Sequence, residues 1–275
     1  MRIVLVGCGG TGMELLKLLG GRASKILVVD HDRIHLTNLH RLFMFTKEDQ
    51  GKYKSEKAAE FINKQYGGRA SFLVRRIEEV PINVLNQYDV IFGALDNIEG
   101  RMNLNLMFRK SECKLLIDCG ISGYRAHAKA VYRGSSCLYC IRELYREDGP
   151  EICSLGSLPK KITPENREKT LRSLVELRRE EPGSREEKIK KIINEFNALA
   201  EENLKVNAFD VVGMFDEIIP NVCFINSVCA SLACGLIDAT NLHYDFIFYS
   251  GEKNITLEKL ILDRDEKCIV CNTDA

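Results

Sequence analysis

The sequence predicts an α/β protein built on a doubly wound parallel sheet, and three patterns support this prediction. Short apolar runs rich in β-branched residues alternate with stretches of helical spacing. A glycine-rich turn joins the first apolar run to the first helical stretch, and carboxylates such as Asp30 and Asp96 directly follow apolar runs. Such runs, separated by helices, are typical of a parallel sheet that is covered on both faces. We expect strands at 2–6, 25–30, 71–77, 89–97 and 114–120, and helices after the first strand, at 55–63 and at 98–110.

The turn after the first strand has the spacing of a nucleotide-binding loop. Its residues are Gly7, Cys8, Gly9, Gly10, Thr11 and Gly12. Glycines allow the backbone to approach a phosphate, and the start of the following helix offers free N–H groups and the positive end of its dipole. Asp30, at the end of the second strand, suits a ribose hydroxyl, so the order of elements is Rossmann-like. The alternative is a glycine turn that only packs the helix onto the strand.

Other polar residues are expected near the same crevice. Asn38 and Arg41 lie in a polar, irregular stretch after Asp30. Lys54 stands at the head of a helix, where a cation opposes the dipole, so a neighbouring anion such as a triphosphate would explain it. In isolation it reads as a solvated surface lysine. Asp96 is a candidate magnesium ligand, because nucleotide-bound magnesium typically uses one or two carboxylates and phosphates.

Two CxxC pairs supply the four thiolates of a structural zinc site. They are Cys137 with Cys140 and Cys268 with Cys271. The metal would tie the end of the chain to the middle of the fold, whereas a redox CxxC is the alternative for either pair. We expect the other cysteines of apolar runs and glycine turns to be small core residues. These are Cys8, Cys113, Cys119, Cys223, Cys229 and Cys234.

Cys153 differs from these cysteines because it lies in a loop rich in Gly, Ser and Pro, next to Lys160 and Lys161. A thiol in a partly electropositive loop is in the environment expected of a nucleophile.

Composition excludes several other classes of protein. The 275 residues carry 39 Lys+Arg and 39 Asp+Glu, so the zero formal charge gives no support for a nucleic-acid or membrane partner. We find no signal-peptide pattern and no apolar run near the ~20 residues of a membrane helix. Eleven cysteines without a secretion signal favour reduced thiols or metal ligands. We therefore expect a soluble protein of the cytoplasm, the nucleus or both.

The chain becomes highly charged between Thr163 and Leu204. Residues 186–204 predict an amphipathic helix of an inserted subdomain, and 176–185 predict a solvated linker or turn. Apolar sequence resumes at 218–226, with a helix through Ala239. The apolar face of the amphipathic helix carries Ile189, Ile192, Ile193, Phe196 and Leu199, and a hairpin is expected at 243–249 and 255–260.

Taken together, the motifs resemble the adenylation family of bacterial MoeB and ThiF and the eukaryotic ubiquitin-like-protein activating enzymes. The resemblance covers nearly the whole chain. Around Cys153, the sequence from Cys153 to Pro159 is similar to the signature of the catalytic cysteine in the eukaryotic enzymes. The matching motifs are the glycine turn, Asp30-x-Asp32, Asn38-Leu39-x-Arg41-x-Phe43, Gly51-x-x-Lys54, Ala94-Leu95-Asp96-Asn97 with Arg101, and both CxxC pairs.

The resemblance implies a role for each part of the chain. Residues 1–147 would form the adenylation domain, 148–212 a small, mainly helical catalytic-cysteine insert, and 213–275 the zinc-tied return to the adenylation domain. The glycine turn and Asp30 would hold ATP, and Arg41 and Lys54 would clamp its phosphates. Asp96 would bind magnesium, and Cys153 would form a thioester with the modifier. The pocket would be lined by Asn38, Ile77, Leu95 and Asn97.

The resemblance also implies partners. The catalytic subunits of heterodimeric activating enzymes work with a catalytically silent subunit, a ubiquitin-like modifier and a conjugating enzyme. The cysteine signature and the short insert favour the Rub-type modifier, whereas Ala94-Leu95-Asp96-Asn97 and Phe209-Asp210 favour SUMO.

Three departures from the family pattern stand out. His40 and Leu42 replace the Asn and Gln of the family, which would change two polar contacts near the phosphates, and Ser154 replaces a Thr. We also expect the C-terminal ubiquitin-fold domain, which captures the conjugating enzyme, to be absent.

Other functions are disfavoured by particular residues. An NAD-dependent oxidoreductase would share the glycine turn, but Arg41, Lys54 and Asp96 suit a triphosphate with magnesium better. A silent scaffold subunit would not need Cys153. A MoeB-type sulfur-carrier adenylyltransferase would not need the helical insert.

Overall fold

The computed structural model describes residues 1–39, 41–145, 161–163, 166–179, 181–208, 211, 223–251 and 254–271. The chain divides into two compact units: Met1–Glu147 with Asn221–Ala275, and Asp148–Pro220. The predicted insert at 148–212 falls within the second unit, and its role as a catalytic-cysteine insert stays a prediction.

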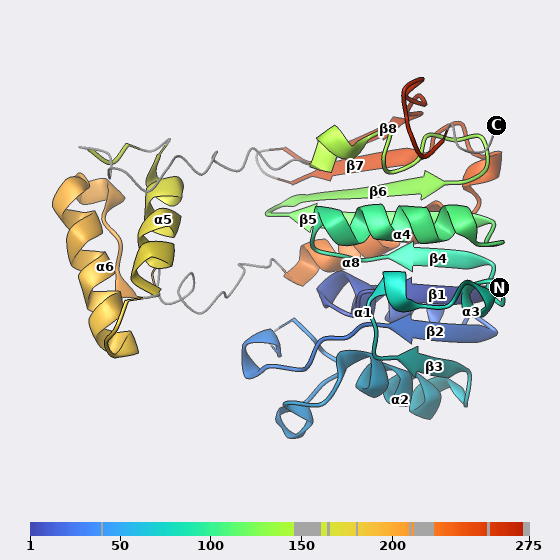
Figure 1. Ribbon diagram of the computed structural model, residues 1–275, viewed down its shortest axis with the longest axis horizontal. Coiled ribbons are helices and arrows are strands. Elements are labelled where there is room, and N and C mark those ends of the chain that lie inside the picture. The colour runs from blue at the N-terminus through green and yellow to red at the C-terminus, as the bar shows by residue number, and fades with distance from the viewer. Residues whose placement is uncertain are drawn as a thin grey trace. The chain divides into compact units, whose positions relative to one another are not determined.

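The first unit contains an eight-stranded sheet of order β3-β2-β1-β4-β5-β6-β7-β8 (Figure 1). The pairs from β3 to β5 are parallel, and those from β5 to β8 are antiparallel. This confirms the predicted Rossmann-like sheet. The strands are β1 Arg2–Val6, β2 Lys25–Val29, β3 Ala70–Leu73, β4 Val90–Gly93, β5 Leu115–Ser122, β6 Arg125–Val131, β7 Phe246–Ser250 and β8 Thr256–Leu260. The helices of this unit are α1 Gly10–Leu19, α2 Lys54–Tyr66, α3 Ile82–Leu85, α4 Ile98–Lys110 and α8 Cys223–Gly235.

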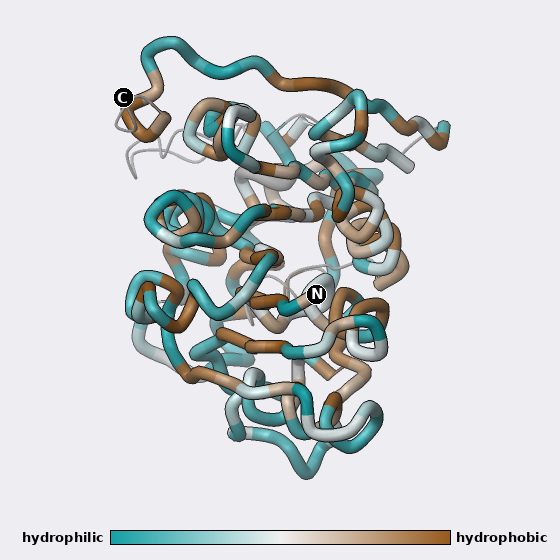
Figure 2. Tube along the Cα trace, turned by 90° about the vertical axis from the view of Figure 1, so that its right-hand side faces the viewer, coloured by the Kyte–Doolittle hydropathy of each residue, from teal (hydrophilic) through white to brown (hydrophobic). Residues whose placement is uncertain are grey.

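Strands β1, β2 and β4 have buried side chains on both faces of the sheet, since successive side chains of a strand point to opposite faces. Ile3 and Leu5 of β1 belong to one apolar core, with residues of α1, α2 and α8. Val4 and Val6 belong to a second core, with residues of α4. Figure 2 shows the hydrophobic strands lying between helices on two sides. Burial on both faces explains why these strands read as continuous apolar runs.

Several predicted elements end earlier than expected. The strand predicted at 89–97 ends at Gly93, because its neighbour β1 ends at Val6. The strand predicted to reach Ile77 ends at Leu73, because β3 is an edge strand whose neighbour β2 ends at Val29. Ile77 instead begins a 3₁₀ turn. The helix predicted through Ala239 ends at Gly235, and a separate 3₁₀ turn covers Ala239–Asn241. The predicted C-terminal hairpin is confirmed as β7 and β8.

The pattern of the sequence did not predict β6. Its core-facing residues are the small Ala126, Ala128 and Ala130, which give a weak apolar signal. The strand also buries Lys129, whose Nζ lies 2.5 Å from Asp245 Oδ2. A buried ammonium requires such a partner, so this ion pair joins β6 to the start of β7.

The second unit packs two helices around its own small apolar core. These are α5, Arg167–Arg179, and α6, Arg185–Leu199, so the predicted amphipathic helix is confirmed but ends at Leu199. Its predicted face is largely buried, with Ile189, Ile192 and Phe196 in the core. The prediction of a linker from residue 176 was wrong, because α5 continues to Arg179 and Arg178 pairs with Glu195 of α6 at 2.8 Å.

None of the helices in the described part of the chain combines the length and apolar character that a membrane span requires.

Candidate functional site

The glycine turn between β1 and α1 is shaped by two close backbone approaches. Gly7 has a φ of +92°, and a Cβ there would lie 2.4 Å from the carbonyl oxygen of Ala94. A Cβ on Gly12 would lie 2.1 Å from the carbonyl oxygen of Gly7. At Gly9, by contrast, a Cβ would meet nothing within 4 Å. Gly7 and Gly12 therefore allow tight packing, whereas Gly9 leaves the open surface that a phosphate would need.

Helix α1 begins directly beyond this opening. Its N-cap is Gly9, which supplies no side-chain hydrogen bond to the N–H groups of the first turn. Thr11 Oγ1 donates to Asn226 Oδ1 at 2.9 Å, and the Asn226 side chain lies against Gly10. Asn226, in the first turn of α8, therefore buttresses the turn from a position 215 residues away in sequence. No short-range pattern points to this residue.

Asp30 braces the same turn. Its Oδ2 accepts a hydrogen bond from the Cys8 N–H at 2.6 Å, and its Oδ1 accepts from the Asp32 N–H at 2.7 Å. Burial raises the pKa of Asp30, and the positive charge of Lys54 opposes that shift. Each carboxylate oxygen has a further lone pair, so the predicted bond to a ribose hydroxyl is chemically possible.

Lys54 lies close to Asp32, with 2.8 Å between Nζ and Oδ2. Only 13% of the Lys54 side chain is exposed, compared with 51% for Asp32. Burial would raise the pKa of Asp32, but the hydrogen bond and charge of Lys54 hold it below its usual value. The lysine is thus a mostly buried cation at the first residue of α2, which is not the environment of a freely solvated surface lysine.

Arg41 lies on the loop that follows β2 and is half-buried, as is Asn38. Burial lowers the pKa of Arg41, and the nearby Cys223 and Asp96 act in the opposite direction. Arg41 is therefore within electrostatic reach of the predicted magnesium ligand. Leu42 is buried in the first core, so the departure from the family pattern at this position gives an apolar contact. His40 lies outside the described residues.

The turn between β4 and α4 presents Asp96 to solvent. Asn97 caps α4 by accepting from the Gly100 N–H at 2.7 Å, and its Nδ2 donates to Asp96 Oδ1 at 3.0 Å. Leu95 is half-buried, whereas Ile77 is buried in the second core. The carboxyl ends of β1, β2 and β4 thus bring together the glycine turn, Asp30 and Asp96, as expected for a ligand site of a doubly wound sheet.

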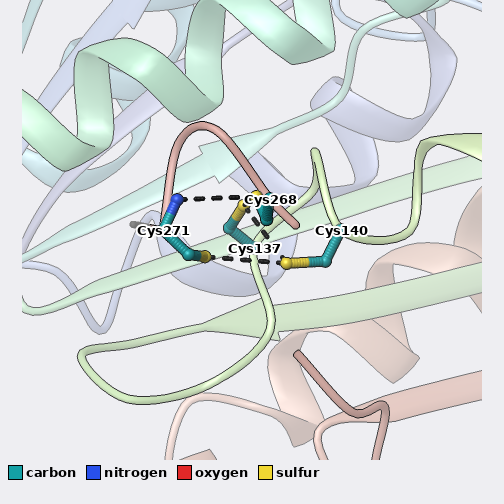
Figure 3. A group of neighbouring side chains, drawn as sticks. All are labelled: Cys137, Cys140, Cys268 and Cys271. Carbon is teal, nitrogen blue, oxygen red and sulfur yellow. Dashed lines mark hydrogen bonds between the residues drawn. The ribbon is translucent and has the colours of Figure 1, made fainter. Parts of the chain in front are cut away.

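The four cysteines of the CxxC pairs lie together (Figure 3). The Sγ–Sγ distances are 3.8 Å for Cys137–Cys140, 3.7 Å for Cys137–Cys268 and 3.6 Å for Cys140–Cys271. Tetrahedral zinc with Zn–S bonds of ~2.3 Å requires sulfur atoms ~3.8 Å apart. The donor set and its spacing therefore fit structural zinc.

Nearby residues hold the four cysteines in place. The Leu138 N–H, between the first two cysteines, donates to Asn105 Oδ1 of α4 at 3.1 Å. Ser136 Oγ donates to the Leu262 carbonyl at 2.6 Å, which connects the two segments that carry the pairs. The Cys271 N–H points to Cys268 Sγ at 3.5 Å. Such contacts to the ligands and their loops are typical of metal sites.

The remaining cysteines mostly match the prediction of small core residues. Cys8, Cys113, Cys119 and Cys229 are buried, and Cys234 is half-buried. Burial raises the pKa of Cys8 well above its usual value, so this thiol stays neutral. The prediction was wrong for Cys223, which is exposed because it is the first residue of α8, ahead of the buried positions of that helix. Cys153 lies outside the described residues.

Sequence reasoning also missed a buried polar cluster around Asp118 of β5. Arg101 pairs with Asp118, and His127 and Tyr145 lie beside it. The signal was present, because Asp118 follows an apolar run just as Asp30 and Asp96 do.

The fold and the site define an α/β protein of Rossmann-like topology with an open glycine turn at the strand ends and a cluster of four cysteines. The chain belongs to the ThiF family, which matches residues 1–259. It is 27% identical to the NEDD8-activating enzyme E1 catalytic subunit of Arabidopsis thaliana, over 98% of this chain and 65% of that protein. It is 26% identical to the protein of the same name from Saccharomyces cerevisiae, over 93% of this chain and 89% of that protein.

Other similarities extend over less of the chain or concern the fold alone. SUMO-activating enzyme subunit uba-2 of Caenorhabditis elegans is 31% identical over 58% of this chain and 28% of that protein. The crystal structure of E. coli MccB with ATP matches with a TM-score of 0.58 and 18% identity, over 98% of this chain and 66% of that one. These comparisons confirm the resemblance to the family that the motifs indicate. The chain spans about two thirds of the Arabidopsis protein, so its own reaction and partners are proposals.

Proposed function

We propose that this chain is the catalytic subunit of an enzyme that uses ATP to activate a ubiquitin-like modifier. The observation that carries the proposal is the meeting of three strand ends, which brings together the open glycine turn, Asp30 and the Asp96 turn. Lys54 and Arg41 add positive charge beside two of these parts. The triphosphate of ATP concentrates more negative charge than the pyrophosphate of a dinucleotide, so it suits these two cations better.

In the first step, the chain binds ATP and places its α-phosphate for attack by the C-terminal carboxylate of the modifier. Amides at the start of α1 receive phosphate oxygens near Gly9, and Asp30 receives a ribose hydroxyl. Asn38, Ile77, Leu95 and Asn97 line the nucleotide pocket. Arg41 and Lys54 neutralise the phosphates, and Asp96 holds a magnesium ion, which supplies further charge neutralisation. A carboxylate oxygen forms a bond to the α-phosphorus, and pyrophosphate leaves.

In the second step, the Cys153 thiolate attacks the carbonyl carbon of the acyl-adenylate. A C–S bond forms, the C–O bond to the phosphate breaks, and AMP leaves with the bonding electron pair. The resulting thioester then passes to a cysteine of a conjugating enzyme. The thiol must lose its proton before attack, which the neighbouring basic residues Lys160 and Lys161 favour.

We propose that the four clustered cysteines hold a structural zinc ion. With four thiolates and no open coordination position, the site would contribute stability, not catalysis. We further propose a silent partner subunit and the Rub-type modifier. The NEDD8-activating relatives support this modifier, and the SUMO-activating relative keeps SUMO as the second candidate.

Exchange of radiolabel between pyrophosphate and ATP tests the two-step assignment. The chain is assayed with its co-purified partner subunit, Mg-ATP and a panel of ubiquitin-like proteins. Asp96→Ala should abolish exchange, whereas Cys153→Ala should retain exchange and lose the thioester. Persistent exchange in Asp96→Ala would count against its role with magnesium. A thioester in Cys153→Ala would mean that another cysteine is the acceptor.

A further inference from the structure

A buried ion pair lies in the same part of the fold as the four clustered cysteines. Lys129 of β6 has no exposed surface, and Asp245, directly before β7, is 2% exposed. The Lys129 Nζ lies 2.5 Å from Asp245 Oδ2. The cost of burying two charges can exceed the gain from their attraction, so such a pair is weak evidence for stability. A role besides stability would explain why the pair is buried here.

The carboxylate of Asp245 connects this ion pair to the segment that carries the second CxxC pair. Its Oδ1 accepts a hydrogen bond from the Leu262 N–H at 3.1 Å, and the Leu262 carbonyl oxygen accepts from Ser136 Oγ at 2.6 Å. Ser136 directly precedes Cys137, and Cys268 follows Leu262 by six residues. The hydrogen bonds from Asp245 therefore lead to both segments that meet in the cluster (Figure 3).

Backbone hydrogen bonds fix Asp245 between two strands. Its N–H donates to the carbonyl oxygen of Leu260 in β8 at 3.0 Å, and its carbonyl oxygen accepts from the Ala130 N–H of β6 at 2.8 Å. The carboxylate is thus held in place by the sheet itself, and it can in turn hold the ammonium of Lys129 in a defined position.

The ammonium of Lys129 also lies within electrostatic reach of the cysteine cluster. Burial lowers the pKa of Lys129, and Asp245, Cys140 and Cys137 act in the opposite direction. Of these two thiols, Cys137 is buried and Cys140 is half-buried. An attraction between this ammonium and a thiolate is therefore screened much less than one on the surface.

The charge of a zinc-loaded cluster explains why a buried cation matters there. Four thiolates outweigh a divalent ion, so the loaded site carries two net negative charges. Cys137, Cys268 and Cys271 are each at most 3% exposed. A buried negative charge requires a positive partner or hydrogen-bond donors. Lys129 is such a partner, and the Cys271 N–H, 3.5 Å from Cys268 Sγ, is such a donor.

We propose that Lys129 is a counter-charge for the four thiolates and a positioning residue for the zinc ion that they would hold. Asp245 takes part because it holds Lys129 with one carboxylate oxygen and the Leu262 segment with the other. The pair thus sets the affinity of the cluster for zinc, and not only the stability of the sheet. The inference rests on the proposal that the cysteine cluster binds zinc.

Removal of the charge at Lys129 tests this role. Lys129→Met keeps most of the apolar length of the side chain and loses the ammonium. We expect it to raise the Kd for zinc about 10–100-fold, the usual effect of replacing a residue that supports the ligands of a metal. The Kd is measured on the full, zinc-loaded chain by competition with a chromogenic chelator at one neutral pH. Lys259→Met is the matched control, because Lys259 is an exposed cation of β8, and it should leave the Kd unchanged.

A second variant separates the effect of charge from the effect on folding. Lys129→Met leaves Asp245 as an unpaired buried carboxylate, which by itself destabilises the fold. Lys129→Met/Asp245→Asn removes both charges and keeps an oxygen that accepts from the Leu262 N–H. We expect this double variant to recover most of the melting temperature lost in Lys129→Met but to keep the raised Kd for zinc. If Lys129→Met does not fold, the double variant decides alone.

Recovery of both the melting temperature and the zinc affinity in the double variant would overturn the inference, because the pair would then act through folding alone. An unchanged Kd in both variants, or an equal rise in Lys259→Met, would overturn it as well. A wild-type chain that binds no zinc with its cysteines reduced would instead contradict the zinc proposal itself. The wild-type protein thus separates the two failures.

Discussion

At the scale of single residues, the glycines of the turn between β1 and α1 have different roles. Gly12 is needed because α1 passes so close to the backbone of Gly7 that a methyl group would overlap it. Gly9 has room for a methyl group and an extended backbone, with φ −83° and ψ −160°, that any residue can adopt. The fold therefore requires Gly12, whereas only a ligand requires Gly9.

Alanine substitutions should separate these two roles. Gly12→Ala should lower the free energy of unfolding by about 1–3 kcal/mol, the usual cost of overpacking. Gly9→Ala should lower the free energy of unfolding by less than about 1 kcal/mol, which is the cost of replacing Gly with Ala at an N-cap. It should nevertheless raise the KM for ATP severalfold, because its methyl group occupies the opening. Denaturant unfolding and pyrophosphate exchange measure the two quantities. An unchanged KM for ATP in Gly9→Ala would mean that the phosphates do not bind at this opening.

At the scale of the elements, an ion pair joins the start of β1 to the segment before β4. Asp89 Oδ2 accepts from the Arg2 N–H at 2.8 Å, and Arg2 Nη2 lies 2.6 Å from Asp89 Oδ1. Arg2 therefore lowers the pKa of Asp89 from 3.8 to about 2. The pair fixes the end of the sheet opposite the glycine turn.

This pair gives the stability a defined dependence on pH. A carboxyl whose pKa is lower in the folded state stabilises the fold above its ordinary pKa and loses that contribution as pH falls through the folded value. At pH 7 the wild-type protein should therefore have a higher melting temperature than Asp89→Asn. This gap in melting temperature should close as the pH falls from about 4 to about 2. Thermal melts over that range, with Asp96→Asn as an exposed control, measure the gap. A gap that does not change with pH would mean that Asp89 acts by packing.

At the scale of the whole chain, the cysteine cluster joins segments 131 residues apart. The zinc proposal predicts about one metal ion per folded chain by native mass spectrometry. Cys271→Ser should lose the metal and lower the melting temperature, whereas Cys234→Ser, which lies outside the cluster, should retain it. Acidification should release the metal as thiolates take up protons. A metal-free wild-type protein of full stability would contradict the assignment.

Much of this architecture could be predicted because the signals are local. The apolar runs of β1, β2 and β4 and the turn at Gly9 follow from spacing and residue type alone. The alanine-rich β6 and the Thr11–Asn226 contact could not be predicted in this way, since the first has a weak apolar pattern and the second joins distant segments. The cluster of four cysteines was predicted from two local pairs, and the structure brings those pairs together.

The most direct test of the proposed activity is a non-reducing gel of the chain, its partner subunit, Mg-ATP and each ubiquitin-like protein. We predict an adduct with one modifier, the Rub-type first, that thiol reductant removes and that Cys153→Ser does not form. No adduct with any modifier, in the presence of the partner, would contradict the activating function and favour a silent scaffold or a sulfur-carrier enzyme.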